Sequence, residues 1–146
     1  MITLDANVLI ARADENDATH ERAVEVLDHH EWDEYATSAV TLAEVLVRPV
    51  RDGVLEKMQQ DLRALHIIVV AVQDDDAPGI AELTAVHRLS SPDAVVLYTA
   101  MTTSDAIVTF DARLGRVARM IGFPVIERAP QDLGWDLPHS PWCSAE

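Results

Sequence analysis

Short apolar runs alternate with longer amphipathic stretches along the chain. The runs that we expect to be strands are residues 2–5, 34–38, 67–72, 106–111 and 124–127. Helices are expected within residues 6–13, 14–31, 39–50, 54–66, 77–89, 90–101 and 112–122. Because strands alternate with helices, the pattern predicts an α/β fold in which a parallel sheet carries helices on both faces, a three-layer sandwich.

Local signals refine three of these elements. Pro49 predicts that its helix ends near Val47 or Arg48. Ser91 is expected to cap the helix that follows it, with Pro92 at the first helical position. The run at 67–72 is apolar throughout, which is typical of a strand buried on both faces.

The length of 146 residues predicts one domain, which we place at residues 1–127, followed by a loosely structured tail at 128–146. No apolar run is long enough to span a membrane, and no basic leader precedes the first strand. The single cysteine, Cys143, cannot form a disulfide within the chain. We therefore expect a cytoplasmic protein.

The net charge is −14 at pH 7, which is the wrong sign for holding nucleic acid by bulk electrostatics. A polyanionic substrate would need bridging cations or a local group of basic residues. The cationic side chains are ten arginines and Lys57. The sequence does not rank the arginines that could serve, among them Arg12, Arg48, Arg88, Arg113 and Arg116.

Polar side chains stand where strands end and helices begin. Asp5 ends the first strand and Asn7 follows it, whereas Asp111 ends the strand that contains Thr109. Asp93 lies in the first turn of its helix. In a parallel α/β sheet these positions share the carboxyl edge, where ligands bind. Taken singly, each aspartate has an ordinary explanation as a helix cap or as a partner of the helix dipole.

Glu44 is harder to explain in this way, because it is the only charge within the apolar run 39–47, in mid-helix. A helix that is apolar all round is buried, so Glu44 is either buried beside a cation or exposed in a cleft. Four acids at one edge would repel one another. A hard divalent cation with oxygen ligands, Mg²⁺ or Mn²⁺, resolves that conflict.

The motifs "LDANVLI", "TSAVTLAEVL", "SPDAVVLYTA" and "IVTFDARL" resemble the motif set of PIN domains, most closely the toxin ribonucleases of VapBC toxin–antitoxin pairs. The resemblance covers roughly residues 1–127, with the motifs in the order of that family. It implies a Mg²⁺- or Mn²⁺-dependent endoribonuclease that hydrolyses phosphodiester bonds in single-stranded RNA with a metal-activated water. It also implies a homodimer and inhibition by a small cognate antitoxin. The residues carried over are the acidic metal-binding and catalytic set Asp5, Glu44, Asp93 and Asp111, with Asn7 and Thr109 in support.

Three other functions stay open from the sequence. The first is an RNA-processing nuclease that has no antitoxin, and the second is a catalytically silent scaffold. The third is a phospho-acceptor α/β domain, such as a response-regulator receiver or a dehalogenase-like phosphatase. That class needs a lysine at the end of a late strand, and Lys57, the only lysine, lies in mid-helix.

Overall fold

The computed structural model describes residues 1–130, so Cys143 and all but the first residues of the predicted tail at 128–146 lie outside the described range. Its strands are β1 (Ile2–Leu4), β2 (Tyr35–Ser38), β3 (Ile68–Val70), β4 (Ala106–Val108) and β5 (Val125–Ile126). They form one parallel sheet in the order β3-β2-β1-β4-β5. The predicted α/β class and the parallel sheet are confirmed.

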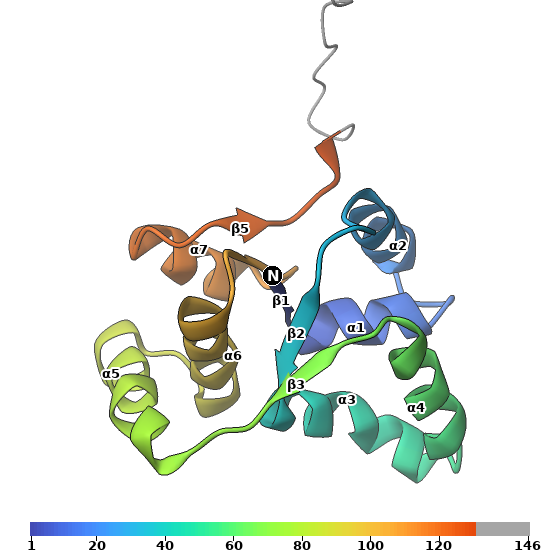
Figure 1. Cartoon of the computed structure of the whole chain (residues 1–146), viewed down its shortest axis with the longest axis horizontal. Helices are drawn as coiled ribbons and strands as arrows, with labels where there is room; N and C mark the ends of the chain where they lie inside the picture. Colours follow the sequence, from blue (N-terminus) through green and yellow to red (C-terminus); the bar gives the residue numbers. More distant parts are fainter. Residues whose placement is uncertain (131–146) are drawn as a thin grey trace, which may run out of the picture.

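Seven α-helices and one short 3₁₀ helix connect these strands within residues 1–130. They are α1 (Ala6–Ala13), α2 (His20–His29), α3 (Ala39–Arg51), α4 (Leu55–Ala64), η1 (Asp74–Asp76), α5 (Ala77–His87), α6 (Ser91–Thr103) and α7 (Ala112–Met120). In Figure 1, α1 to α4 lie on one side of the sheet and α5 to α7 on the other. None of the helices in the described part is both long and apolar enough to cross a membrane.

The two faces of the sheet carry separate apolar cores, because successive strand residues point to opposite faces. Val108 belongs to the core shared with α1, α2, α3 and α4, which also contains Leu9, Val26 and Met58. Ile107, its neighbour on β4, belongs to the core shared with α5, α6 and α7. The three-layer arrangement expected from the alternating pattern is therefore present.

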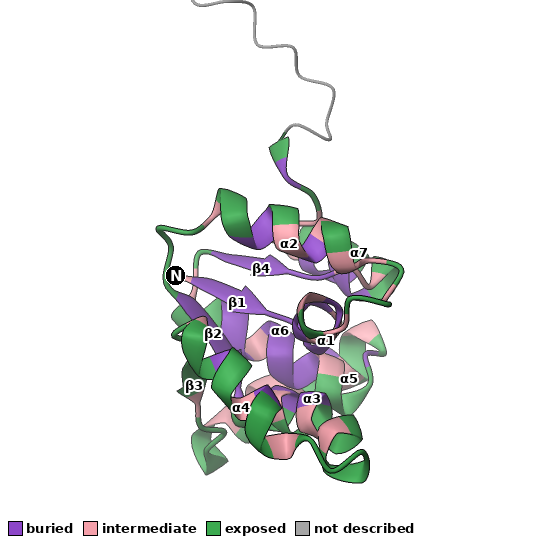
Figure 2. Ribbon diagram, turned by 90° about the vertical axis from the view of Figure 1, so that its right-hand side faces the viewer, coloured by how far each residue is buried: buried purple, intermediate pink, exposed green. Residues whose placement is uncertain are grey.

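The register of β1 and β4 brings their carboxyl ends together. Leu4 lies opposite Val108, and the Asp5 backbone N–H donates to the Val108 carbonyl at 3.0 Å. The residues that follow the two strands are therefore neighbours in space although they are about a hundred positions apart in sequence. Figure 2 shows β1 and β4, both buried, running side by side toward the start of α1.

The expectation that residues 67–72 form a strand buried on both faces is wrong. β3 is shorter and lies at the edge of the sheet, where Ile68 is 43% and Val69 48% exposed. An edge strand has a neighbour on one side only, and an apolar run does not reveal how many neighbours its strand will have.

Helix α3 also differs from the prediction, since it continues through Pro49 to Arg51. Proline removes one backbone donor but leaves its carbonyl free to accept. Here the Pro49 carbonyl accepts from the Val54 N–H at 2.9 Å, and the Asp52 N–H still donates to the Arg48 carbonyl. The helix is not buried all round either, because Val47 and Val50 are exposed.

The start of α6 is shifted by one residue from the prediction. Ser90, not Ser91, is the N-cap, and its hydroxyl accepts from the Asp93 backbone N–H at 3.4 Å. Pro92 accordingly occupies the second helical position. Two adjacent serines offer two equivalent caps to a local pattern, and the sequence does not choose between them.

Candidate metal centre

Asp5 is a buried carboxylate held by two neutral donors. Asp5 is the N-cap of α1, and the residue is only 6% exposed. Oδ1 accepts from the Ala6 backbone N–H at 2.8 Å, and Oδ2 accepts from the Thr109 hydroxyl at 2.7 Å. The two bonds fix the orientation of the carboxylate, and each oxygen keeps lone-pair capacity for a further partner.

Thr109 links Asp5 to the loop between β4 and α7. Because its hydroxyl donates to Asp5, its oxygen is free to accept, and it does so from the Asp111 backbone N–H at 3.0 Å. The Asp111 carboxylate caps α7 by accepting from the Leu114 N–H at 2.9 Å. Asn7 adds a second tie, since its Oδ1 accepts from the Phe110 N–H at 3.3 Å. Four of the six polar residues named from the sequence, Asp5, Asn7, Thr109 and Asp111, thus form hydrogen bonds to or within this loop.

Asp93 reaches the same edge from α6. The helix leads into β4, so it begins at the carboxyl edge of the sheet and ends at the amino edge. Asp93 stands in its first turn and is half-buried. The Ser90 hydroxyl accepts from its backbone N–H, and Ser90 also forms a side-chain hydrogen bond with the Asp93 carboxylate.

The pKa values indicate that these aspartates act on one another. Burial raises the pKa of Asp5 to about 6, against the bonds from Thr109 and Ala6, and the charges of Asp93 and Asp111 raise it further. Burial also raises the pKa of Asp93, with Asp111 adding to the shift while Ser90 and the nearby Arg113 oppose it. A carboxylate raises the pKa of another in this way only when the two lie within several ångströms of each other. The structure therefore brings Asp5, Asp93 and Asp111 into one electrostatic field.

Glu44 stands at the margin of this group. It is exposed on α3, and its pKa is raised by partial burial and then by the charge of Asp93. It forms no ion pair with a cation of residues 1–130. The sequence left two alternatives for Glu44, burial beside a cation or exposure in a cleft. The second is correct, because Glu44 lines a groove between α1, α3 and α4.

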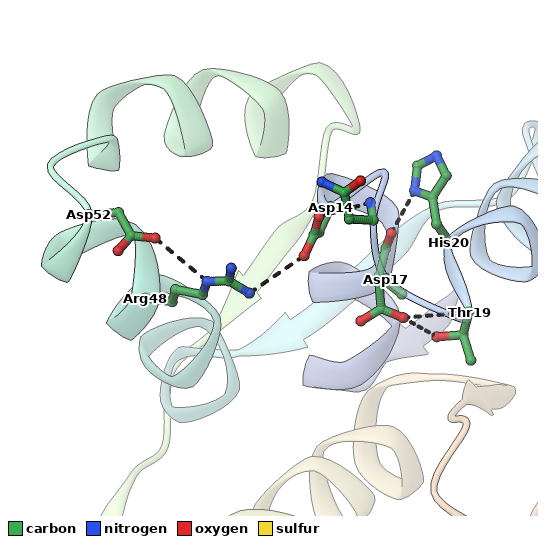
Figure 3. Close-up of polar contacts among 8 residues, drawn as sticks. Asp14, Asp17, Thr19, His20, Arg48 and Asp52 are labelled. Carbon is green, nitrogen blue, oxygen red and sulfur yellow. Dashed lines mark hydrogen bonds and ion pairs between the residues drawn. The ribbon is translucent and has the colours of Figure 1, made fainter.

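That groove has a volume of about 260 Å³. Its apolar residues include Ile10, Val45 and Met58, and its acids besides Glu44 are Asp14, Asp52 and Asp61. Arg48 also lines it and lies 3.5 Å from both Asp14 and Asp52, a bridge between α1 and α3 that Figure 3 shows. The groove has an apolar floor and a rim that is acidic on balance.

The donor set suits a hard divalent cation, because every candidate ligand is a carboxylate oxygen. Within residues 1–130, however, no three acidic, histidine or cysteine side chains stand at the spacing of a formed metal site. Burial raises the pKa of both Asp5 and Asp93, and neighbouring acids add to each shift. The residues fit the ion by the chemistry of their oxygen donors and by their placement at one sheet edge.

Sequence reasoning missed several residues that shape the site. The capping role of Ser90 was signalled by the serine pair but assigned to the wrong member. The stacking of the Arg22 guanidinium over the Phe110 ring, 4.2 Å from its centroid, has no sequence signal because it joins α2 to the β4–α7 loop. The groove likewise depends on how three helices pack.

Comparison with solved structures gives neighbours at low identity. A toxin–antitoxin complex from Klebsiella pneumoniae aligns with a TM-score of 0.68 and 22% identity, covering 87% of this chain and 97% of that one. VapC20 of Mycobacterium tuberculosis, a toxin that cleaves the sarcin–ricin loop, aligns at 0.66 and 18%, covering 84% and 96%. FitAcB from Neisseria gonorrhoeae aligns at 0.69 and 21%, covering 87% and 97%. At these identities the likeness establishes the fold alone.

No curated protein matches the chain. The family profile of the PIN domain matches residues 2–120, which include every candidate ligand. That match spans most of the 146 residues, and it agrees with the parallel sheet order and with the aspartates at its carboxyl edge. The chain therefore belongs to the PIN domain family.

Proposed function

We propose that this protein is a Mg²⁺- or Mn²⁺-dependent endoribonuclease that acts as the toxin of a toxin–antitoxin pair. The observation that carries the proposal is the placement of Asp5, Asp93 and Asp111 at one sheet edge, where the charges of Asp93 and Asp111 act on Asp5 and the charge of Asp111 acts on Asp93. Membership of the PIN family and the toxins among its structural neighbours support it. Lys57 lies within α4 and not at the end of a strand, which disfavours a phospho-acceptor domain.

Asp5, Asp93 and Asp111 would hold the cation, with Glu44 beside them. When bound, a divalent ion lowers the pKa of water and offsets charge that develops on a phosphodiester under attack. Hydrolysis then consumes one water and cleaves one P–O bond of the RNA. The protein must supply the carboxylates in their charged form, so at limiting metal concentration binding of the ion is expected to strengthen as the pH rises through the Asp5 pKa of about 6.

The neutral donors around Asp5 prepare it for this task. The Thr109 hydroxyl and the Ala6 N–H both favour the carboxylate over the acid and oppose the effect of burial. The same hydroxyl holds the Asp111 backbone, so the distance between the two aspartates depends on one threonine. Asn7 steadies the intervening loop through the Phe110 N–H.

We further propose that a cognate antitoxin inhibits the enzyme by placing a cationic side chain among the acids. The groove beside Glu44 is a suitable seat for the rest of its segment, since an amphipathic helix with a basic edge matches an apolar floor and an acidic rim. An arginine offers five donors and would compete with both metal and phosphate. Assembly as a homodimer and a cytoplasmic location belong to the same proposal and rest on the family resemblance.

The decisive experiment is an RNA cleavage assay with purified protein in Mg²⁺, in Mn²⁺ and in excess EDTA. Cleavage is expected with either ion and is expected to stop in EDTA. Activity that survives EDTA would refute the metal mechanism, and no cleavage of any RNA would refute the ribonuclease.

Two further observations test the partner and the assembly. A short neighbouring reading frame that encodes a DNA-binding domain and a flexible tail would support an antitoxin, and its absence would favour an RNA-processing nuclease. A co-crystal with the partner bound elsewhere and the acids left open would refute the inhibitory mechanism. Light scattering that finds only a 16.1 kDa species would count against the homodimer.

A further inference from the structure

The arginines of this protein differ in whether their guanidinium groups form ion pairs with carboxylates of the same chain. RNA approaching the acidic edge carries phosphates on both sides of the bond to be cut, and a metal ion offsets charge at that bond only. Flanking phosphates need cationic side chains close to Asp93 and Asp111. This requirement rests on the proposed ribonuclease function.

Arg48 and Arg119 each form an ion pair with a neighbouring carboxylate. Arg48 bridges Asp14 and Asp52 at the groove (Figure 3). Arg119, in the last turn of α7, lies 3.0 Å from the Glu127 carboxylate near β5. Each of these charges is partly neutralised within the fold, so neither is the first choice for holding RNA.

Arg113 differs from Arg48 and Arg119 in its surroundings. It lies in the first turn of α7, two residues after Asp111, and is exposed. Its guanidinium forms no ion pair with any carboxylate of residues 1–130. Its charge nevertheless reaches the site, because it opposes the rise in the pKa of Asp93. Among the described residues that shift the pKa values of Asp5, Glu44 and Asp93, it is the one cation.

A hydrogen bond fixes where the Arg113 side chain points. Its Nη2 donates to the backbone carbonyl of Arg88, the residue that ends α5 in a left-handed conformation with φ of 56°. Arg88 is exposed and precedes the Ser90 cap of α6 by two positions. The contact therefore brings the Arg113 guanidinium from α7 to the backbone of the α5–α6 turn, two residues before the Ser90 cap of the helix that carries Asp93.

We propose that Arg113 and Arg88 form a binding site for a backbone phosphate of the RNA, next to the bond that the acidic cluster cleaves. A guanidinium has five N–H donors, and the Arg88 carbonyl uses one of those of Arg113, so a planar fork remains for phosphate oxygens. The bond to Arg88 also orders a long side chain before substrate arrives, which lowers the entropic cost of binding. The site reads the polyanionic backbone and carries no base specificity.

The test is steady-state cleavage of a short single-stranded RNA by Arg113→Gln and Arg88→Gln, with Mn²⁺, between about 50 and 200 mM KCl. For Arg113→Gln we expect KM to rise about tenfold with kcat little changed. The slope of log kcat/KM against log salt should become shallower by about 0.7, the value for one phosphate contact on a single strand. Arg88→Gln should change both quantities in the same direction and by less.

Arg119→Gln is the matched control, since it removes the same charge from the same helix, away from the acids; it should keep the wild-type KM and salt slope. A Mn²⁺ titration separates binding from positioning. Loss of a cation beside Asp93 leaves Mn²⁺ affinity equal or higher, whereas a disturbed site lowers it.

An unchanged KM and salt slope in Arg113→Gln would overturn the phosphate site. A fall in kcat with weaker Mn²⁺ binding would overturn it too and make Arg113 a positioning residue for Asp93. Wild-type protein that cleaves no RNA would instead refute the proposed function itself, so the two failures are distinguishable.

Discussion

The aspartates at the two edges of the central sheet have opposite environments. At the amino edge, Asp105 is 91% exposed in its side chain and accepts from the N-terminal ammonium of Met1 at 3.0 Å. At the carboxyl edge, Asp5 is buried, its donors are neutral, and the charges around it are other acids. Water and a cation offset the first charge, whereas nothing of opposite sign within residues 1–130 pairs with the second.

The difference indicates that the acids at the carboxyl edge lower the folding stability of the protein. An aspartate that served only to cap α1 would gain nothing from a pKa of about 6 or from two acidic neighbours. Strained or repulsive arrangements that persist in a fold cluster where ligands bind. The carboxyl edge is therefore where we propose that the function lies, and the amino edge supplies the internal control.

The largest expected effect is on cleavage. Asp111→Asn and Asp93→Asn each remove a charged ligand and should lower kcat/KM for RNA by about a thousandfold, a loss of several kcal/mol of transition-state stabilisation. Asp105→Asn should cleave at the wild-type rate. The measurement is a gel assay with Mn²⁺, and normal activity in the first two variants would reduce these acids to caps.

The second effect is on stability in EDTA as a function of pH. The Asp5 pKa is about 6 in the folded protein, against an ordinary value of 3.8 for an aspartate in an unfolded chain, so the native state binds the proton more tightly. Its contribution to stability is complete below pH 3.8 and is lost as the pH rises through 6, a total of about 3 kcal/mol.

Asp5→Asn should abolish this dependence. At pH 8 the neutral Asn avoids the cost of the buried charge but loses one of the two hydrogen bonds that the carboxylate accepts. The net result should be a variant that is more stable than wild type by about 1 kcal/mol. Urea denaturation from pH 4 to pH 8 is the measurement. A variant that is less stable than wild type by the same amount at both ends of the range would contradict the raised pKa of Asp5 and its cause in burial and neighbouring acids.

A smaller effect is expected when the hydroxyl that joins Asp5 to Asp111 is removed. Thr109→Val keeps the shape of the side chain but loses the donor to Asp5 and the acceptor for the Asp111 N–H. The pKa of Asp5 should rise further, so the pH profile of cleavage should move to higher pH, with activity at pH 7 falling by about 10- to 100-fold. Thr99→Val is the matched control, since that buried hydroxyl bonds to the Val95 carbonyl within α6.

The smallest effect belongs to the amino edge. Asp105→Asn breaks the exposed pair with the Met1 ammonium, and such pairs contribute less than about 1 kcal/mol. The loss should shrink further in about 1 M salt, where exposed charges are screened. Thermal unfolding at low and high salt gives the answer. A salt-independent stabilisation by Asp105→Asn would show that the two edges do not differ as described.

Much of this architecture follows from the sequence. The alternation of apolar runs and amphipathic stretches predicted the parallel sheet, because each period matches one kind of element. Asp5, Asp93 and Asp111 could be placed at one edge, since parallel strands end on the same side and α6 begins there. Ser90 was missed by one position, within the reach of local capping signals.

Other features required the assembled fold. The sequence of residues 67–72 determined that a strand forms, but the strand order β3-β2-β1-β4-β5 made it an edge and left Ile68 and Val69 exposed. In the same way, the apolar run around Glu44 determined a helix, and its packing beside α1 and α4 opened the groove that keeps that acid in contact with solvent.

The arginines show the division most clearly. The sequence contains ten arginines and does not distinguish among them. Whether the charge of each is neutralised depends on the groups that lie within a few ångströms of it. Tertiary contacts tie Arg48 to two carboxylates and Arg119 to one, and they leave Arg113 beside Asp93 with no such partner in residues 1–130. Residue types and their spacing determine which elements form and where polar groups stand on them, whereas exposure and pairing are long-range quantities that only the packed structure decides.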